Sequence, residues 1–512
     1  MSHITCGDRR VDGVDLQRRI AQAASALESI GVGPGTGVAM CLRNEIEFYE
    51  VCVGAGALGA YAVPINWHFA PEEVRYILED SGATVLVVHA DLLPRFAHVV
   101  PADVEVRVVP TSDAVRAVYD LAEADVTLPA EAVNWTTWIE SFEPRPAKPA
   151  EMPLAIFYTS GTTGRPKGVR RPPFTPEQQK SLVGMVTIDY GLGIDDPADL
   201  VTGVVGPVYH AAPSAHAVYS FRAGSSMVIM PRFDPEELLR LIEQERITNL
   251  NMVPIMFSRL LKLPDEVRGR YDLSSLRFVA HAAAPCPPDV KRAMIEWWGP
   301  VINEYYGATE IGNVTFCTAE EWLARPGTVG RAKVGAQIRI LDGDENDMPA
   351  GQIGEIAASY PGLENFTYHG DEEKRRKADR NGLTAPGDMG YLDEDGYLFI
   401  SDRKIDMVVS GGVNIYPAEI EMALINMPDV ADCAVFGVPD DEFGEALYAV
   451  VEPAPGADPS VEDVQAWLRD RIAGYKVPRQ IEFRTGLPRE DSGKIFKRKL
   501  RAPFWEHAGR SI

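Results

Sequence analysis

The sequence predicts an α/β protein with a large N-terminal domain and a small C-terminal one. At 512 residues the chain is long enough for about two to four domains. Strand and helix signals alternate through most of it, which favours layers of α/β structure with largely parallel sheets. Near residue 402 a turn-rich run of short strands ends, and a stretch that could form a small α+β domain follows. We therefore predict domains of residues 1–402 and 403–512.

The elements of this fold can be located from apolar spacing and from capping residues. Apolar side chains recur at helical spacing from Leu16 to Ile30, and Gly31 follows them. Asp234 supplies a helix N-cap, with Pro235 at the first helical position. The small domain is predicted to contain a helix from Pro417, strands near Cys433–Val438 and Ala446–Val451, and a helix near Val461–Ile472.

Composition and charge exclude several classes of protein. The net charge is −24, whereas nucleic acids and acidic membranes require a basic protein face. The six cysteines are scattered without CxxC pairs, which fits a reducing compartment and offers no metal or redox site. The N-terminus lacks the apolar core of a signal peptide, and the longest uncharged run, Val51–Ala70, contains four glycine or proline breaks. We therefore expect a cytoplasmic protein with no nucleic-acid partner and no stable membrane insertion.

The most informative segment is Tyr158–Val169, with the sequence YTSGTTGRPKGV. It follows the apolar run Leu154–Phe157, which is typical of a buried strand. Glycines allow successive backbone N–H groups to turn toward one anion, and hydroxyl and ammonium groups donate to phosphate oxygens. The segment therefore predicts a polyphosphate cradle at the end of a strand, with a merely polar loop as the alternative. The predicted cradle residues are Thr159, Ser160, Gly161, Thr162, Thr163 and Lys167, and Arg165, Arg170 and Arg171 add positive charge beside them.

Spacing separates this cradle from two common phosphate loops. It matches neither G-x-x-x-x-G-K-[ST] nor G-x-G-x-x-G. Pro166 restricts Arg165 to extended conformations, so we expect the phosphate to be held by a loop and not by a helix N-terminus. The segment instead resembles the signature loop of the adenylate-forming superfamily, which includes acyl- and aryl-CoA synthetases, luciferases and peptide-synthetase adenylation domains. The resemblance extends from about residue 14 to about residue 501.

The resemblance implies a fold and a chemistry. Members have a large N-terminal domain of layered α/β sheets with a distorted β-barrel, a hinge at the place of residue 402, and a small mobile α+β C-terminal domain. By this likeness the chain is an AMP-forming acyl-CoA synthetase that uses ATP, Mg²⁺ and CoA. A carboxylic acid is activated as acyl-adenylate with release of pyrophosphate, and CoA then displaces AMP.

A second motif, Asn303–Glu310, has the sequence NEYYGATE. An aromatic ring can stack on a purine, and a carboxylate beside phosphates can hold Mg²⁺; a strand and turn is the plainer interpretation. By the family likeness Tyr306 stacks on adenine, Thr309 contacts the α-phosphate and Glu310 holds Mg²⁺. Glu304 falls where the family binds the adenine amino group. The loop Ala282–Pro285 resembles the one on the other face of adenine, with Ala283 toward the nucleotide and Ala282 toward the acyl substrate.

Asp388 and Arg403 resemble two family residues that reach the ribose. A carboxylate accepts hydrogen bonds from two vicinal hydroxyls, which is what a ribose offers. Two positions after the arginine, where the family pivots and commonly has Asp or Lys, this chain has Ile405. The likeness therefore predicts two domains but leaves the hinge behaviour open.

The remaining candidates also come from the family likeness. Gly411 and Gly412 resemble glycines that line the pantetheine passage during thioester formation. Lys494, in a Ser-Gly-Lys turn, resembles the catalytic lysine that bridges the carboxylate and the α-phosphate. His210 matches a residue that gates the acyl pocket, with Ala211 beside it. Their plainer interpretations are a tight turn, a solvated basic run and a structural histidine.

The acyl group and the acyl acceptor are the least determined features. Small residues from Ala211 to Ala215 leave room for a bulky acyl group. The Asn66–His68 and Arg171–Pro173 segments resemble those of synthetases for fatty, steroid or other polycyclic acids, and this likeness implies such a substrate. One alternative is an acyl-AMP ligase that loads a carrier protein, and another is a non-catalytic nucleotide-binding protein. A kinase or ATPase is excluded because its phosphate-binding motifs are absent. A homodimer is the expectation for assembly.

Overall fold

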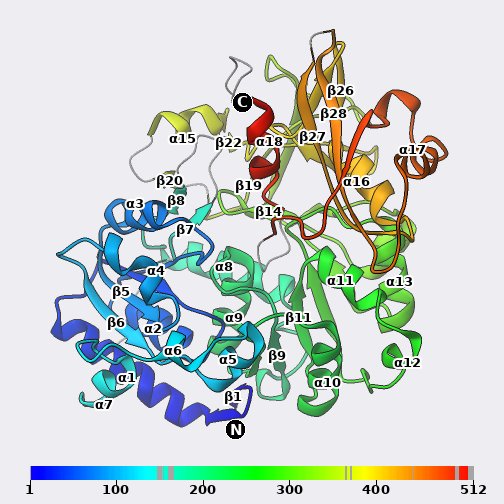
Figure 1. Cartoon of the computed structure of the whole chain (residues 1–512). Helices are drawn as coiled ribbons and strands as arrows, with labels where there is room; N and C mark the ends of the chain where they lie inside the picture. The colour runs from blue at the N-terminus through cyan, green and yellow to red at the C-terminus, as the bar shows by residue number, and fades with distance from the viewer. Residues whose placement is uncertain are drawn as a thin grey trace.

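The computed structural model describes residues 2–146, 153, 155–159, 166–363, 366–368, 372–440, 442–489 and 495–505. In Figure 1 a large body, blue to green, carries a smaller C-terminal body, orange to red, at one end. The α/β class and the pairing of a large N-terminal with a small C-terminal domain are confirmed.

The larger sheet of the N-terminal domain has seven strands in the order β13-β12-β11-β9-β10-β1-β2. Every neighbouring pair is parallel except β1 with β2, as the alternation of strands and helices predicted. The strands are β1 (His3–Cys6), β2 (Arg9–Asp12), β9 (Val201–Val204), β10 (Ser226–Ile229), β11 (Asn249–Met252), β12 (Phe278–His281) and β13 (Ile302–Glu304).

A second sheet of four parallel strands has the order β4-β3-β5-β6. Its strands are β3 (Gly37–Cys41), β4 (Tyr61–Pro64), β5 (Ala83–His89) and β6 (Glu105–Val109). Helices connect the strands of both sheets, because a parallel connection needs a crossover. The α-helices described up to residue 324 are α1 (Gly13–Ser29), α2 (Glu47–Gly56), α3 (Pro71–Ser81), α4 (Leu93–Phe96), α5 (Asp113–Tyr119), α6 (Glu123–Val126), α7 (Trp135–Glu140), α8 (Pro176–Asp189), α9 (Ala211–Ala223), α10 (Pro235–Glu245), α11 (Pro254–Leu261), α12 (Asp265–Arg268), α13 (Pro288–Trp298) and α14 (Ala319–Ala324).

The turn-rich run of short strands before residue 402 forms a six-stranded antiparallel sheet. Its strands are β18 (Gln337–Leu341), β19 (Gly354–Ser359), β21 (Asp379–Arg380), β22 (Leu383–Thr384), β23 (Asp388–Leu392) and β24 (Leu398–Arg403). Smaller elements complete the domain: β7 (Phe157–Thr159), β8 (Lys167–Arg170), β14 (Gly307–Ala308), β15 (Gly312–Asn313), β16 (Thr315–Phe316), β17 (Arg331–Ala332), β20 (Thr367–Tyr368) and α15 (Glu372–Ala378).

The C-terminal domain is a five-stranded sheet covered by helices, which confirms the predicted α+β character. Its strands are β25 (Val408–Ser410), β26 (Val413–Ile415), β27 (Val430–Asp440), β28 (Gly444–Pro453) and β29 (Gln480–Phe483), and its helices are α16 (Pro417–Ile425), α17 (Val461–Arg469) and α18 (Lys497–Trp505).

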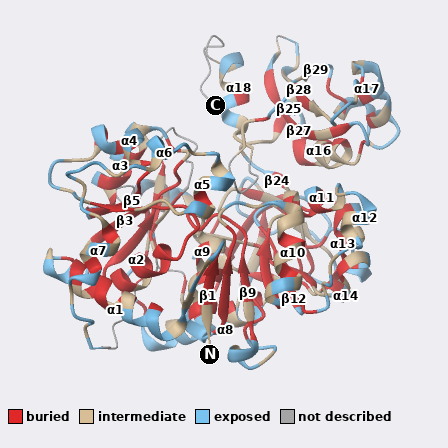
Figure 2. Cartoon of the chain, turned by 60° about the horizontal axis from the view of Figure 1, so that its bottom comes forward, coloured by how far each residue is buried: buried red, intermediate tan, exposed pale blue. Residues whose placement is uncertain are grey.

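Each domain has a hydrophobic core of its own. The described core clusters of the C-terminal domain lie between Val408 and Leu500, and those of the large domain end at Leu398. Figure 2 shows buried residues gathered in the sheets of both bodies. Separate cores are what two domains that could move relative to each other require. The chain passes between them through the turn after β24, and the division at residues 402 and 403 stays our proposal.

Local predictions hold where capping and periodicity are strong. In α1, Leu16, Ile20 and Leu27 are buried, as the helical spacing predicted. The Asp234 side chain accepts a hydrogen bond from the backbone N–H of Glu237 and so caps α10. All six cysteines are buried, free thiols. Among the described helices, none combines the length and apolar character that crossing a membrane requires.

The buried His216 on α9 predicts that the stability of the fold depends on pH. Its ring is buried, packs edge-on against Tyr190 and lies 3.5 Å from the Asn249 amide nitrogen, and burial lowers its pKa to about 3. An unfolded histidine binds a proton near pH 6.5, so between about pH 6.5 and pH 3 the unfolded state holds more protons. We therefore expect the free energy of unfolding to fall as the pH falls through this window, by about 1.4 kcal/mol per pH unit from this group.

Denaturant unfolding between about pH 7 and pH 4 checks this expectation. The His216→Gln variant should lose the corresponding part of the pH slope. If the free energy of unfolding of the variant changes with pH as steeply as that of the unchanged protein, the buried neutral histidine is not the cause of the pH dependence.

Candidate active site

The predicted phosphate cradle is joined to a three-stranded sheet in the order β20-β8-β7. Thr159 ends β7, Lys167 begins β8, and the two residues pair across the hairpin. Ser160, Gly161, Thr162 and Thr163 lie between them, outside the described residues. Because β8 follows Pro166, the described chain leaves the loop as a strand, in agreement with a loop-held phosphate.

Packing of one aromatic ring fixes the base of this hairpin. A Cβ atom at Gly168 would lie 2.7 Å from Cζ of Tyr158, so only glycine fits beneath that ring. The Tyr158 hydroxyl donates to Oδ2 of Asp80 on α3 at 2.6 Å, and burial raises the pKa of the Tyr158 hydroxyl. Packing against Tyr158 therefore explains why residue 168 of the signature is a glycine, whether or not a ligand binds.

The structure brings together three of the predicted nucleotide residues, Tyr306, Asp388 and Arg403. The Tyr306 hydroxyl donates to Oδ2 of Asp388 at 2.7 Å, and Nε of Arg403 lies 3.4 Å from Oδ1. Tyr306 and Asp388 are buried, whereas the Arg403 side chain is 55% exposed. Burial and the Asp388 carboxylate raise the pKa of Tyr306, so its hydroxyl keeps the proton that it donates. Asp388 has lone pairs left for two further donors, such as ribose hydroxyls.

Thr309 and Glu310 lie in the turn between β14 and β15, and both are partly exposed. Oε1 of Glu310 accepts a hydrogen bond from the Tyr368 hydroxyl at 2.9 Å. Within the described residues there is no cluster of three or more metal-ligating side chains. A lone carboxylate with free lone pairs still fits Mg²⁺, which proteins commonly hold with one or two carboxylates and the phosphates of a substrate. Glu310 would hold the ion together with ATP.

Glu304 occupies a different environment from the one that the family likeness implied. Its carboxylate is buried and accepts a hydrogen bond from the Lys291 ammonium on α13, and His281 Nε2 lies 3.4 Å away. Burial raises the pKa of Glu304 and holds that of His281 well below its usual value. A buried carboxylate needs such a partner, so the ion pair with Lys291 accounts for the position of Glu304, and its contact with adenine stays a prediction.

The small-residue loop follows β12. Ala282 is buried, while Ala283 is exposed and has a φ of +72°. A left-handed backbone is uncommon for a residue with a Cβ atom, and such strain collects at ligand-binding loops. This observation favours a functional role for Ala283 over simple tight packing.

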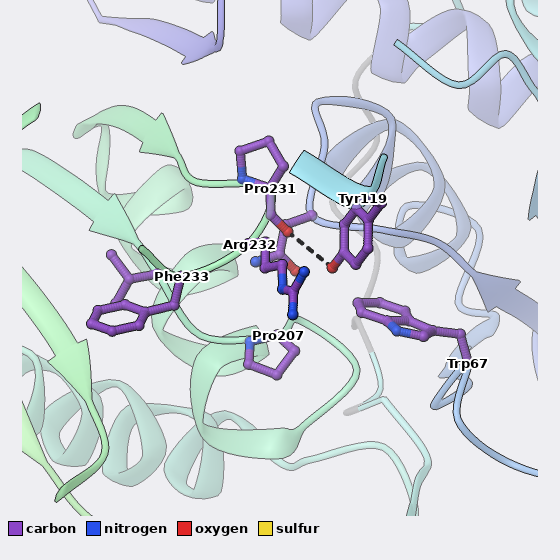
Figure 3. A pocket seen from close by; sticks show the side chains of 8 residues that line it. Trp67, Tyr119, Pro207, Pro231, Arg232 and Phe233 are labelled. Carbon is purple, nitrogen blue, oxygen red and sulfur yellow. Dashed lines mark hydrogen bonds between the residues drawn. The ribbon is translucent and has the colours of Figure 1, made fainter. Parts of the chain in front are cut away.

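Asn44 holds the segment that leads to His210 and Ala211. Its amide donates to the carbonyls of Gly206 and Met230 at 2.9 and 3.2 Å and accepts from the N–H of Val208 at 3.0 Å. A pocket at this place, drawn in Figure 3, is lined by Asn44, Trp67, Tyr119, Val205, Pro207, Pro231, Arg232 and Phe233. His210 then precedes α9, and Ala211 is the first residue of that helix.

The turn at which the family likeness predicts a hinge is held from both sides. Asp402 accepts from the N–H of Ala418 at 2.9 Å and so connects the last strand of the large domain with α16 of the small one. The carbonyl of Ile405 accepts from Arg501 at 3.2 Å. Further contacts between the domains join Lys262 to the carbonyl of Ala431 at 2.7 Å and Asn426 to Asp289 at 3.4 Å.

The C-terminal domain contains the last three candidates, of which the structure describes Gly411 and Gly412. Gly411 and Gly412 form an exposed two-residue hairpin turn with φ values of +58° and +82°, which explains both glycines by backbone geometry. A role beside pantetheine stays a prediction. Lys494 lies outside the described residues, but the chain is anchored on either side of it. Arg489 pairs with Asp432, and Lys497 with Glu421 at 2.8 Å.

Sequence analysis missed the positions of three residues. Arg171 is predicted from the sequence only to add positive charge beside the cradle, yet its side chain is buried and donates to backbone carbonyls. No sequence pattern pointed to Tyr368 or to Asn44, because their partners are far away in the chain. The one sequence signal that could have identified Arg171 as a site residue is its position just after the signature.

Comparison with known proteins identifies the family of the chain. The model of the AMP-binding enzyme family matches residues 2–365, and that of the AMP-binding enzyme C-terminal domain matches residues 419–494. The fatty acid–[acyl-carrier-protein] ligase ScoC of Streptomyces coeruleorubidus is 31% identical over 99% of this chain and 94% of its own. The 3-[(3aS,4S,7aS)-7a-methyl-1,5-dioxo-octahydro-1H-inden-4-yl]propanoyl:CoA ligase of Rhodococcus jostii (strain RHA1) is 34% identical over 98% and 95%.

A solved structure of similar architecture is the anthranilate CoA ligase AuaEII in complex with anthranoyl-AMP. It aligns with a TM-score of 0.85 at 26% identity, over 100% of this chain and 95% of that one. The enzyme class predicted from the sequence, an acid–thiol ligase with ATP, Mg²⁺ and CoA, is confirmed at the level of the family. The chain belongs to the AMP-binding enzymes, the adenylate-forming superfamily that its signature loop predicted.

Proposed function

We propose that this enzyme activates a bulky carboxylic acid as acyl-adenylate and transfers the acyl group to CoA. The observation that carries the proposal is the Tyr306–Asp388–Arg403 network next to the Thr309–Glu310 turn. Residues distant in sequence there provide an aromatic face, a ribose acceptor and a carboxylate in one place. Arg171, which directly follows the signature hairpin, contacts the same region because its side chain donates to the carbonyls of Thr309 and Glu310.

In the first half-reaction a carboxylate oxygen attacks the α-phosphorus of ATP, and pyrophosphate leaves. Tyr306 and Ala283 hold the adenine, Asp388 and Arg403 hold the ribose, and Lys167 with the loop from Thr159 to Thr163 holds the phosphates. Thr309 and Lys494 donate to the α-phosphate, which offsets charge as the bond forms. Mg²⁺ held by Glu310 would neutralise charge on the phosphate oxygens.

In the second half-reaction the thiol of CoA attacks the acyl carbonyl, AMP leaves, and a thioester forms. The adenylate is the activated species, so no cysteine or serine nucleophile is needed. Gly411 and Gly412 would line the pantetheine passage after the small domain has turned. Both glycines are exposed, so the hairpin turn is accessible. The N–H of Gly411 donates to the carbonyl of Phe443, which holds the turn in place.

The acyl group is proposed to be a fatty, steroid or other polycyclic acid. The relative that acts on a fused-ring propanoate supports this class, and so do the small residues at the start of α9 beside His210. We place the enzyme in the cytoplasm, since six free thiols suit a reducing compartment. Assembly as a homodimer stays a prediction.

A second candidate function is transfer of the acyl group to a carrier protein. The similarity to a fatty acid–[acyl-carrier-protein] ligase, over nearly the whole chain, favours this second function.

The experiment that tests both functions supplies ATP and a panel of carboxylic acids, with CoA or with a phosphopantetheinylated carrier protein, and determines product masses. The panel contains short, medium and long fatty, aromatic, steroid and diterpenoid acids. An acyl-CoA product supports the proposal and names the acyl class. Formation of acylated carrier protein without acyl-CoA would show that the acyl acceptor is a carrier protein and not CoA.

A further inference from the structure

We propose that Arg171 and Tyr368 are positioning residues that hold the Thr309–Glu310 turn in the geometry that binds Mg²⁺ and ATP. The inference rests on the proposed function, because it concerns the metal and phosphate groups of the same site. Neither side chain is assigned a contact with substrate. Both act through the residues that they hold.

Arg171 fixes the main chain of the turn. It follows β8 directly, and its side chain is buried. One terminal nitrogen, Nη2, donates to the carbonyls of Thr309 and Glu310 at 2.9 and 2.8 Å, and Nη1 donates to the carbonyl of Leu363 at 2.5 Å. The planar guanidinium presents its donors in fixed directions, so these bonds determine where the two residues lie. A lysine has one nitrogen and could not reach three carbonyls with the same geometry.

Tyr368 fixes the carboxylate of Glu310. Its ring is buried and packs edge-on against Phe366 at a centroid distance of 5.4 Å. Its hydroxyl donates to Oε1 of Glu310 at 2.9 Å, which selects one rotamer and leaves Oε2 available. A carboxylate that is already oriented loses less side-chain entropy when a metal binds.

Both positioning groups come from the sheet that carries the phosphate loop. Tyr368 pairs with Val169, Thr367 pairs with Arg170, and Arg171 continues from there. The same strand, β8, begins at Lys167, where the signature loop ends. The loop and the metal carboxylate are therefore connected through one small sheet and two side chains. This arrangement would keep Lys167, where the signature loop ends, and Glu310 at a constant separation.

The principal test uses Tyr368→Phe, which removes one hydroxyl and keeps the ring. Two quantities are measured: the Mg²⁺ concentration that gives half-maximal pyrophosphate release, and the calorimetric affinity for ATP with Mg²⁺ or with chelator. We expect about a tenfold higher Mg²⁺ requirement and about tenfold weaker ATP binding in the presence of Mg²⁺, the scale of one hydrogen bond to a charged group. Binding in chelator and kcat at saturating Mg²⁺ should be unchanged.

A matched control is Tyr448→Phe. The Tyr448 hydroxyl donates to Glu482 at 3.0 Å on the C-terminal domain, so the same type of bond is lost away from the site. This variant should keep the Mg²⁺ requirement of the unchanged enzyme. If Tyr368→Phe also keeps it in both measurements, the positioning role is wrong even though the enzyme is active.

A second pair of variants tests the arginine. Arg171→Lys and Arg171→Gln should lower kcat for pyrophosphate release by about tenfold and a hundredfold, with the KM for the acid unchanged. Arg331→Gln is the control, since Arg331 donates from Nε and Nη2 to the carbonyl of Asp395 at 3.0 and 2.6 Å on an exposed turn. A raised KM for the acid without loss of kcat would overturn the role of Arg171. Should the Arg171 variants fail to fold, Tyr368→Phe decides alone.

Failure of the proposed function can be told apart from failure of this inference. If the unchanged enzyme releases no pyrophosphate with any acid, the proposed function fails, and calorimetry of ATP with Mg²⁺ still compares Tyr368→Phe with Tyr448→Phe. Weaker Mg²⁺-dependent binding in the first variant only would then support the positioning role. Equal binding in both would overturn it.

Discussion

Replacing Lys494 by alanine is expected to slow adenylation by about 10²–10³, the usual effect of losing one electrostatic donor to a transition state. Thioester formation from a supplied acyl-adenylate should fall far less, because the bond to phosphorus has then already formed. The two rates are measured separately, as pyrophosphate release with ATP and as acyl-CoA formation from synthetic adenylate.

Lys499→Ala provides the control for this variant. Lys499 belongs to the same basic run and is exposed on α18, so its loss removes a charge from the same part of the domain. It should leave both rates unchanged. Equal losses in the two half-reactions of Lys494→Ala would mean that the lysine supports the domain as a whole and not the adenylation step.

Replacing Asp388 by alanine is expected to raise the KM for ATP by about 10²–10⁴-fold. Its carboxylate would accept two ribose hydrogen bonds, each worth about 1.5–3 kcal/mol when the acceptor is charged. It also orients the Tyr306 ring through the 2.7 Å hydrogen bond, so adenine stacking should weaken with it. Tyr306→Phe keeps the ring and should raise the KM for ATP much less.

The control for Asp388→Ala is Asp347→Ala. Asp347 is an exposed carboxylate that pairs with Arg339 at 2.6 Å, beside the same antiparallel sheet. Steady-state kinetics with ATP varied at saturating acid, and the reverse, separate the two substrates. A raised KM for the acid alongside an unchanged KM for ATP would contradict the ribose assignment.

The fold was predictable from the sequence wherever a local signal determines it. The spacing of Leu16 to Leu27, the Asp234 cap and the start of α16 at Pro417 all depend on neighbouring residues, and all agree with the structure. The region 337–403 was harder, because its strands are short and β19 pairs with strands before and after it in the chain. Such pairings leave little periodicity in the sequence.

The site was predictable through motifs and not through contacts. The likeness to a known family named Tyr306, Asp388 and Arg403, and the structure places them in contact. It could not show that Glu304 is paired with Lys291, since only the fold brings α13 against β13. Arg171 and Tyr368 were missed for the same reason. Hydrogen bonds that span 138 and 58 positions in the chain have no local sequence pattern.

The most direct test of the central claim is exchange of labelled pyrophosphate into ATP without CoA. Acyl-adenylate formation is reversible on the enzyme, so exchange should require ATP, Mg²⁺ and the carboxylic acid, and adding CoA should divert the adenylate to thioester. Exchange that requires the carboxylic acid and proceeds without CoA confirms an adenylating ligase. Thioester formation without any acid-dependent exchange, or with ADP in place of AMP as the product, would contradict the account.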